Sequence, residues 1–114
     1  MMILLLSAAL ASAEPPAVVS SLQTAQLAEA CQGKDTDPTT NFCTGYIIGA
    51  LDTLSLSHQI CLSPARASTL EAVAAARKYL RTHRKSWDSA PSFVVRDALK
   101  AAFPCEASAK KKKG

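Results

Sequence analysis

The sequence predicts an all-α fold class, a small four-helix antiparallel bundle held together by two disulfides. Apolar residues recur at helical spacing in two long segments, whereas the alternation typical of a half-buried strand is absent. Alanine, a strong helix former, is abundant. The chain also holds four cysteines, an even number that suggests paired thiols in an oxidising compartment.

The first 13 residues have the pattern of a cleaved signal peptide. They carry no charged side chain, are apolar from Ile3 to Leu10, and end in the small residues Ala11-Ser12-Ala13. The alternative is an N-terminal helix of a cytosolic protein, because only the terminal amine supplies positive charge. The apolar run is too short to span a bilayer. We therefore predict export, cleavage after Ala13 and no integral membrane segment in the mature chain.

The mature chain of about 100 residues suits one domain with a modest core. We expect a flexible segment at 14–20, a helical domain at 21–105 and a disordered lysine-rich tail at 106–114. The net charge of +4 equals the four lysines of that tail, so the body is neutral and has no basic face for nucleic acid. The tail is expected to be solvated, with attraction to anionic lipid headgroups as the alternative.

Two helices are predicted in the first half of the domain. The first runs from about Ser21 to Cys31, with Gly33 just beyond its end, where helices often stop. The second has Asp37 as its cap and Pro38 in its first turn. Its apolar residues are spaced by alternating steps of one and three, which gives one broad stripe: Phe42, Cys43, Tyr46, Ile47, Ala50, Leu51 and Leu54.

Gly45, Gly49 and Asp52 form another line along this second helix. Each glycine costs about 1 kcal/mol relative to alanine inside a helix. We therefore expect a neighbouring backbone to pack closely against the line, either within the chain or across a dimer, with Asp52 bonding that neighbour. The alternative is an exposed face on which the glycines are tolerated.

Two further helices are predicted in the second half. Ser68 and Glu71 have the spacing of a capping box at the start of the third helix. Four apolar residues are expected on its inner side: Leu70, Val73, Ala74 and Leu80. Basic residues crowd its end, where they complement the helix dipole and are expected to be solvated: Arg77, Lys78, Arg81, Arg84 and Lys85. After a turn at Ser86–Ala90, a fourth helix begins at Pro91 and stops at Pro104.

The order of the helices predicts how the cysteines pair. Short loops favour antiparallel neighbours, so Cys31 and Cys43 flank the first loop at one end of the bundle, and Cys61 and Cys105 lie at the other. A Cys43–Cys61 bond would have to span more than about 20 Å along one helix, whereas bridged Cα atoms lie within ~7 Å. We therefore predict Cys31–Cys43 and Cys61–Cys105, each contributing about 3 kcal/mol of stability.

No residue pattern in the sequence indicates catalysis, a metal site or a cofactor. Asp52, Asp88 and Asp97 are scattered, and His58 and His83 lack a local partner motif. Neither a CxxC pair nor a CxxCH motif is present, which argues against a redox dithiol, an attached haem and a zinc site. We therefore expect no enzymatic activity and no cofactor.

The segment FCTGYIIGALD at 42–52 resembles the FCxGYIxGxxD signature of the Rap/Tai immunity proteins. A second matching segment, FPC at 103–105, stands at the end of the domain. The matching residues are Phe42, Cys43, Gly45, Tyr46, Ile47, Gly49, Asp52, Phe103, Pro104 and Cys105. The resemblance covers about 27–105. One departure is Ser63, which stands where the family usually has proline directly after the residue equivalent to Leu62.

The resemblance implies a periplasmic immunity protein associated with type VI secretion in Gram-negative bacteria. Such proteins bind a peptidoglycan amidase effector delivered by another cell and occlude its active-site cleft, without catalysis of their own. They are all-helical, disulfide-bonded and commonly homodimeric. The alternative is an exported envelope protein with a structural, chaperone-like or ligand-binding role and no toxin partner.

The predicted partner-binding surface is the turn between the third and fourth helices, with Arg84, Lys85, Trp87 and Asp88. It holds the only tryptophan of the chain, and inhibitors of hydrolases usually present an aromatic or arginine anchor. The favoured alternative is that Trp87 folds inward and covers the lower end of the bundle. The loops at 32–37 and 58–66 are the remaining candidates.

Overall fold

The computed structural model describes residues 17–37, 39–63 and 69–105 of the chain. The predicted signal peptide and lysine-rich tail lie outside the described residues, and so do Pro38 and Ser68. The described part forms four α-helices and one short 3-10 helix: α1 (Thr24–Ala30), α2 (Phe42–Leu56), α3 (Thr69–Thr82), η2 (Arg84–Asp88) and α4 (Pro91–Ala102). The predicted all-helical, four-helix fold class is confirmed.

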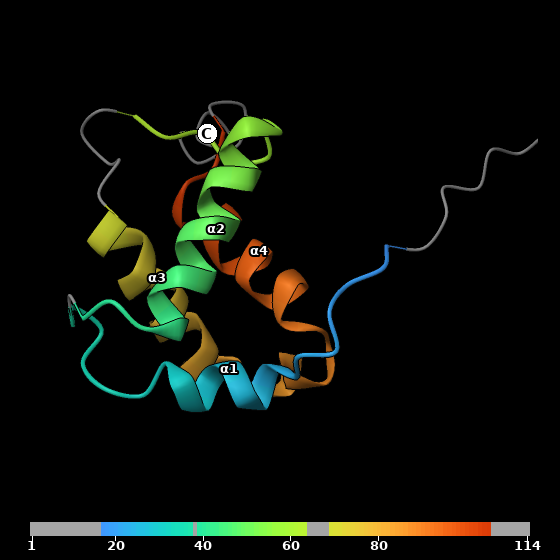
Figure 1. Ribbon diagram of the computed structural model, residues 1–114. Helices are drawn as coiled ribbons and strands as arrows, with labels where there is room; N and C mark the ends of the chain where they lie inside the picture. Colours follow the sequence, from blue (N-terminus) through green and yellow to red (C-terminus); the bar gives the residue numbers. More distant parts are fainter. Residues whose placement is uncertain (1–16, 38, 64–68, 106–114) are drawn as a thin grey trace, which may run out of the picture.

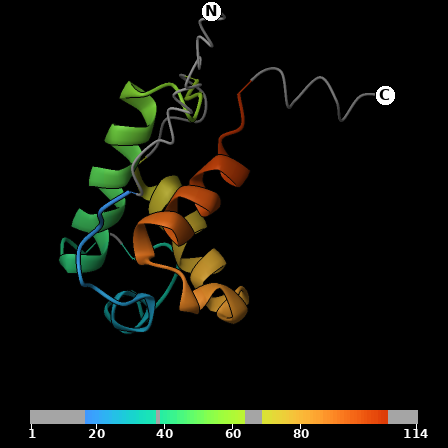
Figure 2. The same ribbon diagram turned by 90° about the vertical axis from the view of Figure 1, so that its right-hand side faces the viewer.

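Three helices run side by side and the fourth lies across their end. In Figure 1, α2 and α4 rise while α3 descends, so these three alternate in direction as predicted. The short α1 crosses beneath them, and Figure 2 shows it almost end-on. The antiparallel arrangement therefore does not extend to α1, which instead covers the lower end of the core. Its position is held by Thr24, whose hydroxyl donates to the carbonyl oxygen of Ser89 at 2.5 Å.

The core lies where α2, α3 and α4 face one another above α1. Its largest fully buried apolar side chains come from all four helices: Leu27, Ile47, Val73, Val94, Val95 and Leu99. Two residues predicted to face inward do not. Phe42, the first residue of α2, is 58% exposed, with its ring 6.1 Å from that of Tyr46. Leu70, in the first turn of α3, is 42% exposed. Both lie in the first turn of their helices.

The N-terminus of α2 is capped by Asn41, so the prediction of Asp37 as its cap is wrong. The Asn41 side chain accepts from the backbone N–H of Thr44 at 3.1 Å, and the Asn41 N–H donates to the Thr44 hydroxyl at 2.8 Å. This reciprocal pair satisfies two groups that a helix start leaves open. Asp37 instead accepts from the N–H and hydroxyl of Thr39, at 2.9 and 2.6 Å, within the preceding loop.

Replacement of the cap tests this assignment. Asn41→Ala is expected to lower the free energy of unfolding by about 1 kcal/mol, because the Thr44 N–H loses its acceptor. Asp37→Ala serves as the control and is expected to have a smaller effect, since its carboxylate bonds only the exposed Thr39. Urea denaturation of the two variants measures both values. A larger loss for Asp37→Ala would restore Asp37 as the residue that fixes the start of α2.

Two disulfides join the helices at opposite ends of the domain. Cys31 bonds Cys43 with their Cα atoms 5.0 Å apart, which ties the end of α1 to the first turn of α2. Cys61 bonds Cys105 with their Cα atoms 4.7 Å apart, which ties the segment after α2 to the end of α4. Both pairs are those predicted. The second connection is reinforced by the Cys61 N–H, which donates to the carbonyl oxygen of Phe103 at 3.1 Å.

Candidate functional site

The candidate sites among the described residues are surface hollows and an exposed turn, and no cluster of reactive side chains is found there. Among residues 17–37, 39–63 and 69–105, no group of three or more His, Cys, Asp and Glu side chains is placed to hold a metal ion. Asp52, Asp88 and Asp97 are exposed on three different elements, α2, η2 and α4. In the same described part, no helix has both the length and the apolar character needed to cross a membrane.

The predicted binding turn forms η2, and its tryptophan packs against the chain itself. The indole N–H of Trp87 donates to the carbonyl oxygen of Leu80 at 2.9 Å, and the side chain is partly buried. Arg84 lies over the ring, with its guanidinium carbon 5.3 Å from the ring centroid. Lys85 and Asp88 are exposed. The turn therefore presents charged side chains to solvent around an indole that is anchored from behind.

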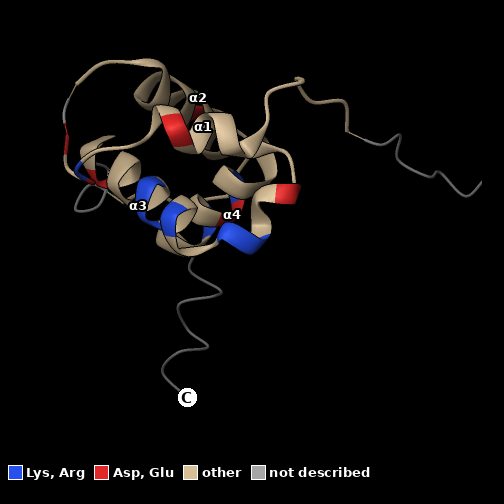
Figure 3. Cartoon of the chain, turned by 90° about the horizontal axis from the view of Figure 1, so that it is seen from below, with Lys and Arg blue, Asp and Glu red and all other residues tan. Residues whose placement is uncertain are grey.

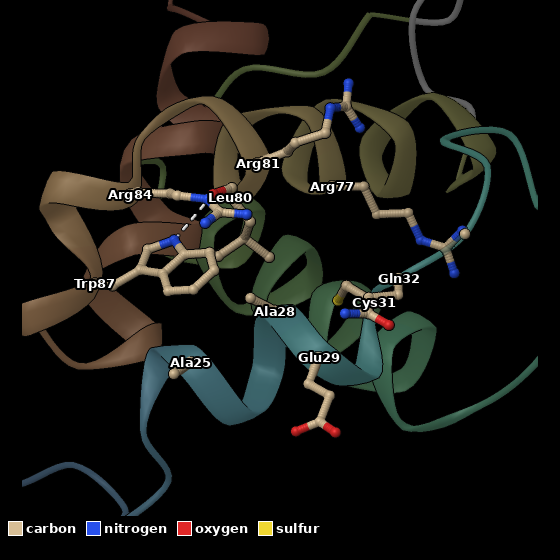
Figure 4. Close-up of a pocket in the computed structure, with 11 residues that line it drawn as sticks. Ala25, Ala28, Glu29, Cys31, Gln32, Arg77, Leu80, Arg81, Arg84 and Trp87 are labelled. Atoms are coloured by element: carbon tan, nitrogen blue, oxygen red, sulfur yellow. Dashed lines mark hydrogen bonds between the residues drawn. The ribbon is translucent and has the colours of Figure 1, made fainter.

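A pocket of about 450 Å³ lies beside this turn, between α1, α3 and η2. Figure 4 shows Trp87 and Arg84 on one side of it and Arg77 on the other, with α1 beneath. The walls combine small or apolar side chains with guanidinium groups: Ala25, Ala28, Leu80, Arg77, Arg81 and Arg84. The carboxylate of Glu29, on the rim, points away from the arginines in this view. Figure 3 shows how the basic residues gather on α3 and the turn that follows it.

Arg77 is buried, so the prediction that it belongs to a solvated helix end is wrong for this residue. Only 3% of it is exposed. One terminal nitrogen, Nη1, donates to the carbonyl oxygen of Lys34. The other two guanidinium nitrogens, Nε and Nη2, are buried and have no hydrogen-bond partner in the described part of the chain. Arg77 follows Val73 by four positions and precedes Leu80 by three, so helical periodicity places it on the inner face.

The loop between α1 and α2 is held on α3 by a second arginine. Arg81 donates to both carboxylate oxygens of Asp35, at 2.6 and 3.1 Å. These hydrogen bonds lower the pKa of Asp35 below its ordinary value and raise that of Arg81. The pKa of Asp37 is also lowered, chiefly by the hydrogen bonds from Thr39. Within this loop, Gly33 adopts a φ of 121°, a conformation that favours glycine.

A second hollow, of about 570 Å³, lies between α2 and α4, and we term it the α2/α4 groove. The Tyr46 hydroxyl reaches across it to the Ser92 hydroxyl, with the oxygens 2.9 Å apart. Its lining is largely apolar and includes both glycines of the predicted line: Gly45, Gly49, Ala50, Leu54 and Phe93. Arg96 lies at its edge and pairs with Asp97 at 3.2 Å.

The two glycines of α2 are open to solvent, so the expected close packing within the chain is wrong. A Cβ atom placed at Gly45 or Gly49 meets no atom of the described chain within 4 Å. Helix α4 lines the other side of the groove, where its Ser92 hydroxyl meets the Tyr46 hydroxyl of α2. Asp52 is likewise exposed. The line therefore forms an unfilled surface, which is the alternative that the sequence left open.

Comparison with known proteins identifies one family. A family model described as Rap1a immunity proteins matches residues 23–105. No curated protein and no solved structure matches the chain significantly. The matched range takes in both disulfides, all four helices and η2.

Proposed function

The chain belongs to the Rap1a immunity protein family, and we propose that it is a periplasmic protein that binds and occludes a peptidoglycan amidase effector. Membership implies a toxin effector as the partner. The observation that carries the proposal is the family match across 23–105, together with the FCTGYIIGALD segment that resembles the immunity signature. Occlusion needs complementary surfaces and no reacting groups, so the protein itself acts without catalysis.

The proposed location is the periplasm of a Gram-negative bacterium that uses type VI secretion. Two formed disulfides support it, because such bonds persist in oxidising compartments. The signal-like segment at 1–13 supports it as well. An amidase that attacks the cell wall acts in this same compartment, so toxin and immunity protein would meet there.

For the effector contact we propose the turn η2, with Arg84, Lys85 and Asp88 as the accessible side chains and Trp87 behind them. The charged groups are exposed and therefore free to pair with groups at the rim of a cleft. The indole, fixed by its bond to Leu80, gives the turn a rigid base. A rigid contact loses less conformational entropy on binding than a mobile one.

The effector contact is tested by co-purification with an amidase encoded beside this gene. We expect the intact mass of wild-type protein from a periplasmic fraction to show that it begins at Glu14. We also expect this protein to retain the amidase during purification. Arg84→Ala should weaken the complex by about 2 kcal/mol if this residue is an anchor. The control is Lys100→Ala, an exposed cation in the last turn of α4 that lies outside both η2 and the α2/α4 groove. Equal affinities for the two variants would remove η2 from the interface, and no amidase binding by the wild type would refute the proposed function.

We further propose that the α2/α4 groove is the contact between two copies of the chain. Isologous dimers bury the same patch of both subunits, and an open glycine line allows two helices to approach closely. Charges of opposite sign are present on the two helices, because the exposed Asp52 lies on the glycine line of α2 and Arg96 of α4 lines the groove. In a two-fold arrangement each aspartate can pair with the arginine of the other copy.

Substitution of one glycine separates self-association from folding. Gly49→Leu is expected to give a folded monomer, because the added side chain meets open space in the single chain but fills the space of a second helix. Gly49→Ala is the control: it should keep the dimer and raise the stability of the fold by up to about 1 kcal/mol through helix propensity. Light scattering measures the mass and circular dichroism the folding. A monomeric wild type, or a dimer that survives Gly49→Leu, would contradict this interface.

A further inference from the structure

We propose that the exposed cations of α3 and η2 form a surface that steers the approach of an effector whose facing surface is acidic. This surface, the basic face, consists of four exposed side chains: Lys78, Arg81, Arg84 and Lys85. Figure 3 shows the basic residues of α3 and the following turn gathered along one edge of the domain. The inference rests on the proposed function and deepens it, because it states the charge of the partner and extends the contact from η2 along α3.

The charges of the domain are unevenly distributed along the chain. Acidic and basic residues balance outside the lysine tail, yet five basic residues lie within 77–85 and no acidic residue lies among them. One of the five, Arg77, is buried and bonded to the loop at 32–37, which leaves four at the surface. The next acidic residue along the chain is Asp88. A neutral body therefore carries a local excess of positive charge, which attracts an opposite charge from beyond contact distance.

Three of the four side chains of the basic face are not neutralised within the described part of the chain. Arg81 donates to both carboxylate oxygens of Asp35. Lys78, Arg84 and Lys85 form no ion pair with a described residue. Arg84 lies over the Trp87 ring, at 5.3 Å, and this stacking orients the guanidinium without cancelling its charge. These three charges therefore remain available to an incoming partner.

The basic face lacks the apolar side chains that accompany binding to a lipid surface. Helices that lie on membranes combine basic residues with exposed large apolar side chains. In the described part of the chain such side chains lie outside 77–88, at Val18, Val19, Phe42, Leu56 and Leu70. The two arginines of the face also favour carboxylates, because a guanidinium binds a carboxylate through two parallel hydrogen bonds. These features favour an acidic protein surface as the partner.

Steering of this kind predicts a salt-dependent rate of association with the amidase encoded beside this gene. Stopped-flow measurements give the association and dissociation rates separately over a series of sodium chloride concentrations. We expect the association rate of the wild type to fall at least about tenfold from low to high salt, because screening removes the long-range attraction. The dissociation rate should change much less, since charges at the rim of an interface act mainly on the encounter.

Charge substitutions locate the effect on the basic face. Lys78→Glu is expected to lower the association rate at low salt about threefold or more. Lys100→Glu is the matched control, because it changes the net charge equally but lies in the last turn of α4, at the far end of that helix from η2. Asp88→Asn tests the sign, since loss of a negative charge beside the face should speed association. All three residues are exposed and form no ion pair with a described residue, so circular dichroism should show unchanged folding.

The outcomes separate this inference from the function on which it rests. Absence of any complex with the amidase would refute both. A complex that forms at a salt-independent rate would overturn the steering surface alone, and so would equal association rates for Lys78→Glu and Lys100→Glu or slower association of Asp88→Asn. Sedimentation of the wild type with phosphatidylglycerol vesicles, abolished by Lys78→Glu, would assign the basic face to a lipid surface instead.

Discussion

Removal of the Cys61–Cys105 bond is expected to lower the free energy of unfolding by about 4 kcal/mol, the largest effect of any change considered for this protein. The bond closes a separation of 44 residues, so it restricts the unfolded chain more than a short bridge does. Cys61 is exposed in the folded protein, and substitution by serine there leaves no cavity. The loss should therefore come from the cross-link itself and not from altered packing.

The Cys31–Cys43 bond provides the comparison. It closes a separation of only 12 residues, for which the same reasoning gives about 3 kcal/mol. Both of its cysteines are buried, so alanine is the better replacement, since it introduces no buried hydroxyl. Urea denaturation of Cys61→Ser with Cys105→Ser, and of Cys31→Ala with Cys43→Ala, measures the two costs. If the shorter bridge proves to be worth more, strain or packing and not chain entropy controls the stability of this domain.

Trp87→Ala is expected to destabilise the protein by about 3 kcal/mol, near the lower end for truncation of a large aromatic side chain, because the indole is only partly buried. The change removes the contact between η2 and α1 and leaves the Leu80 carbonyl without its donor. Trp87→Phe keeps most of the ring but loses the N–H, so we expect a cost of about 1 kcal/mol.

The same variants separate structural support from direct binding. Thermal or urea unfolding gives stability, and titration with the captured amidase gives affinity for whichever variants remain folded. If Trp87 only supports the turn, folded Trp87→Ala should lose no more affinity for the amidase than Trp87→Phe does. An unchanged unfolding curve for Trp87→Ala would show that the indole does not hold η2 against the body, contrary to its bond with Leu80.

The disulfide connectivity was predictable because it depends only on helix order and length. A helix fixes the distance between its ends, so Cys43 and Cys61 could not meet, whatever the details of packing. The crossing of α1 was not predictable in the same way. A helix of seven residues has little propensity of its own, and its direction is set by the surface that it covers.

The errors at individual residues have equally specific causes. Asp37 and Asn41 are both good capping residues, and Thr44 decides between them by returning a hydrogen bond to Asn41. The charge of Arg77 predicts a solvated side chain, although its helical position puts it on the inner face. The loop at 32–37, which is distant in the chain, buries it. A glycine such as Gly49 inside a helix indicates that another backbone can approach closely. It does not indicate whether that backbone belongs to the same chain or to a second copy.

The positions of the two bridges have a consequence for the motion of α2. Cys43 lies in its first turn and Cys61 lies shortly after its last residue, so both ends are covalently tied to other parts of the domain. Helix ends ordinarily fray, and their amide hydrogens exchange with solvent by small local openings. In α2 such openings are restrained at both ends. Its amides should therefore exchange slowly even along the solvent-facing glycine line, through openings that involve the whole domain, and a partner that docks there meets a surface already in its final shape.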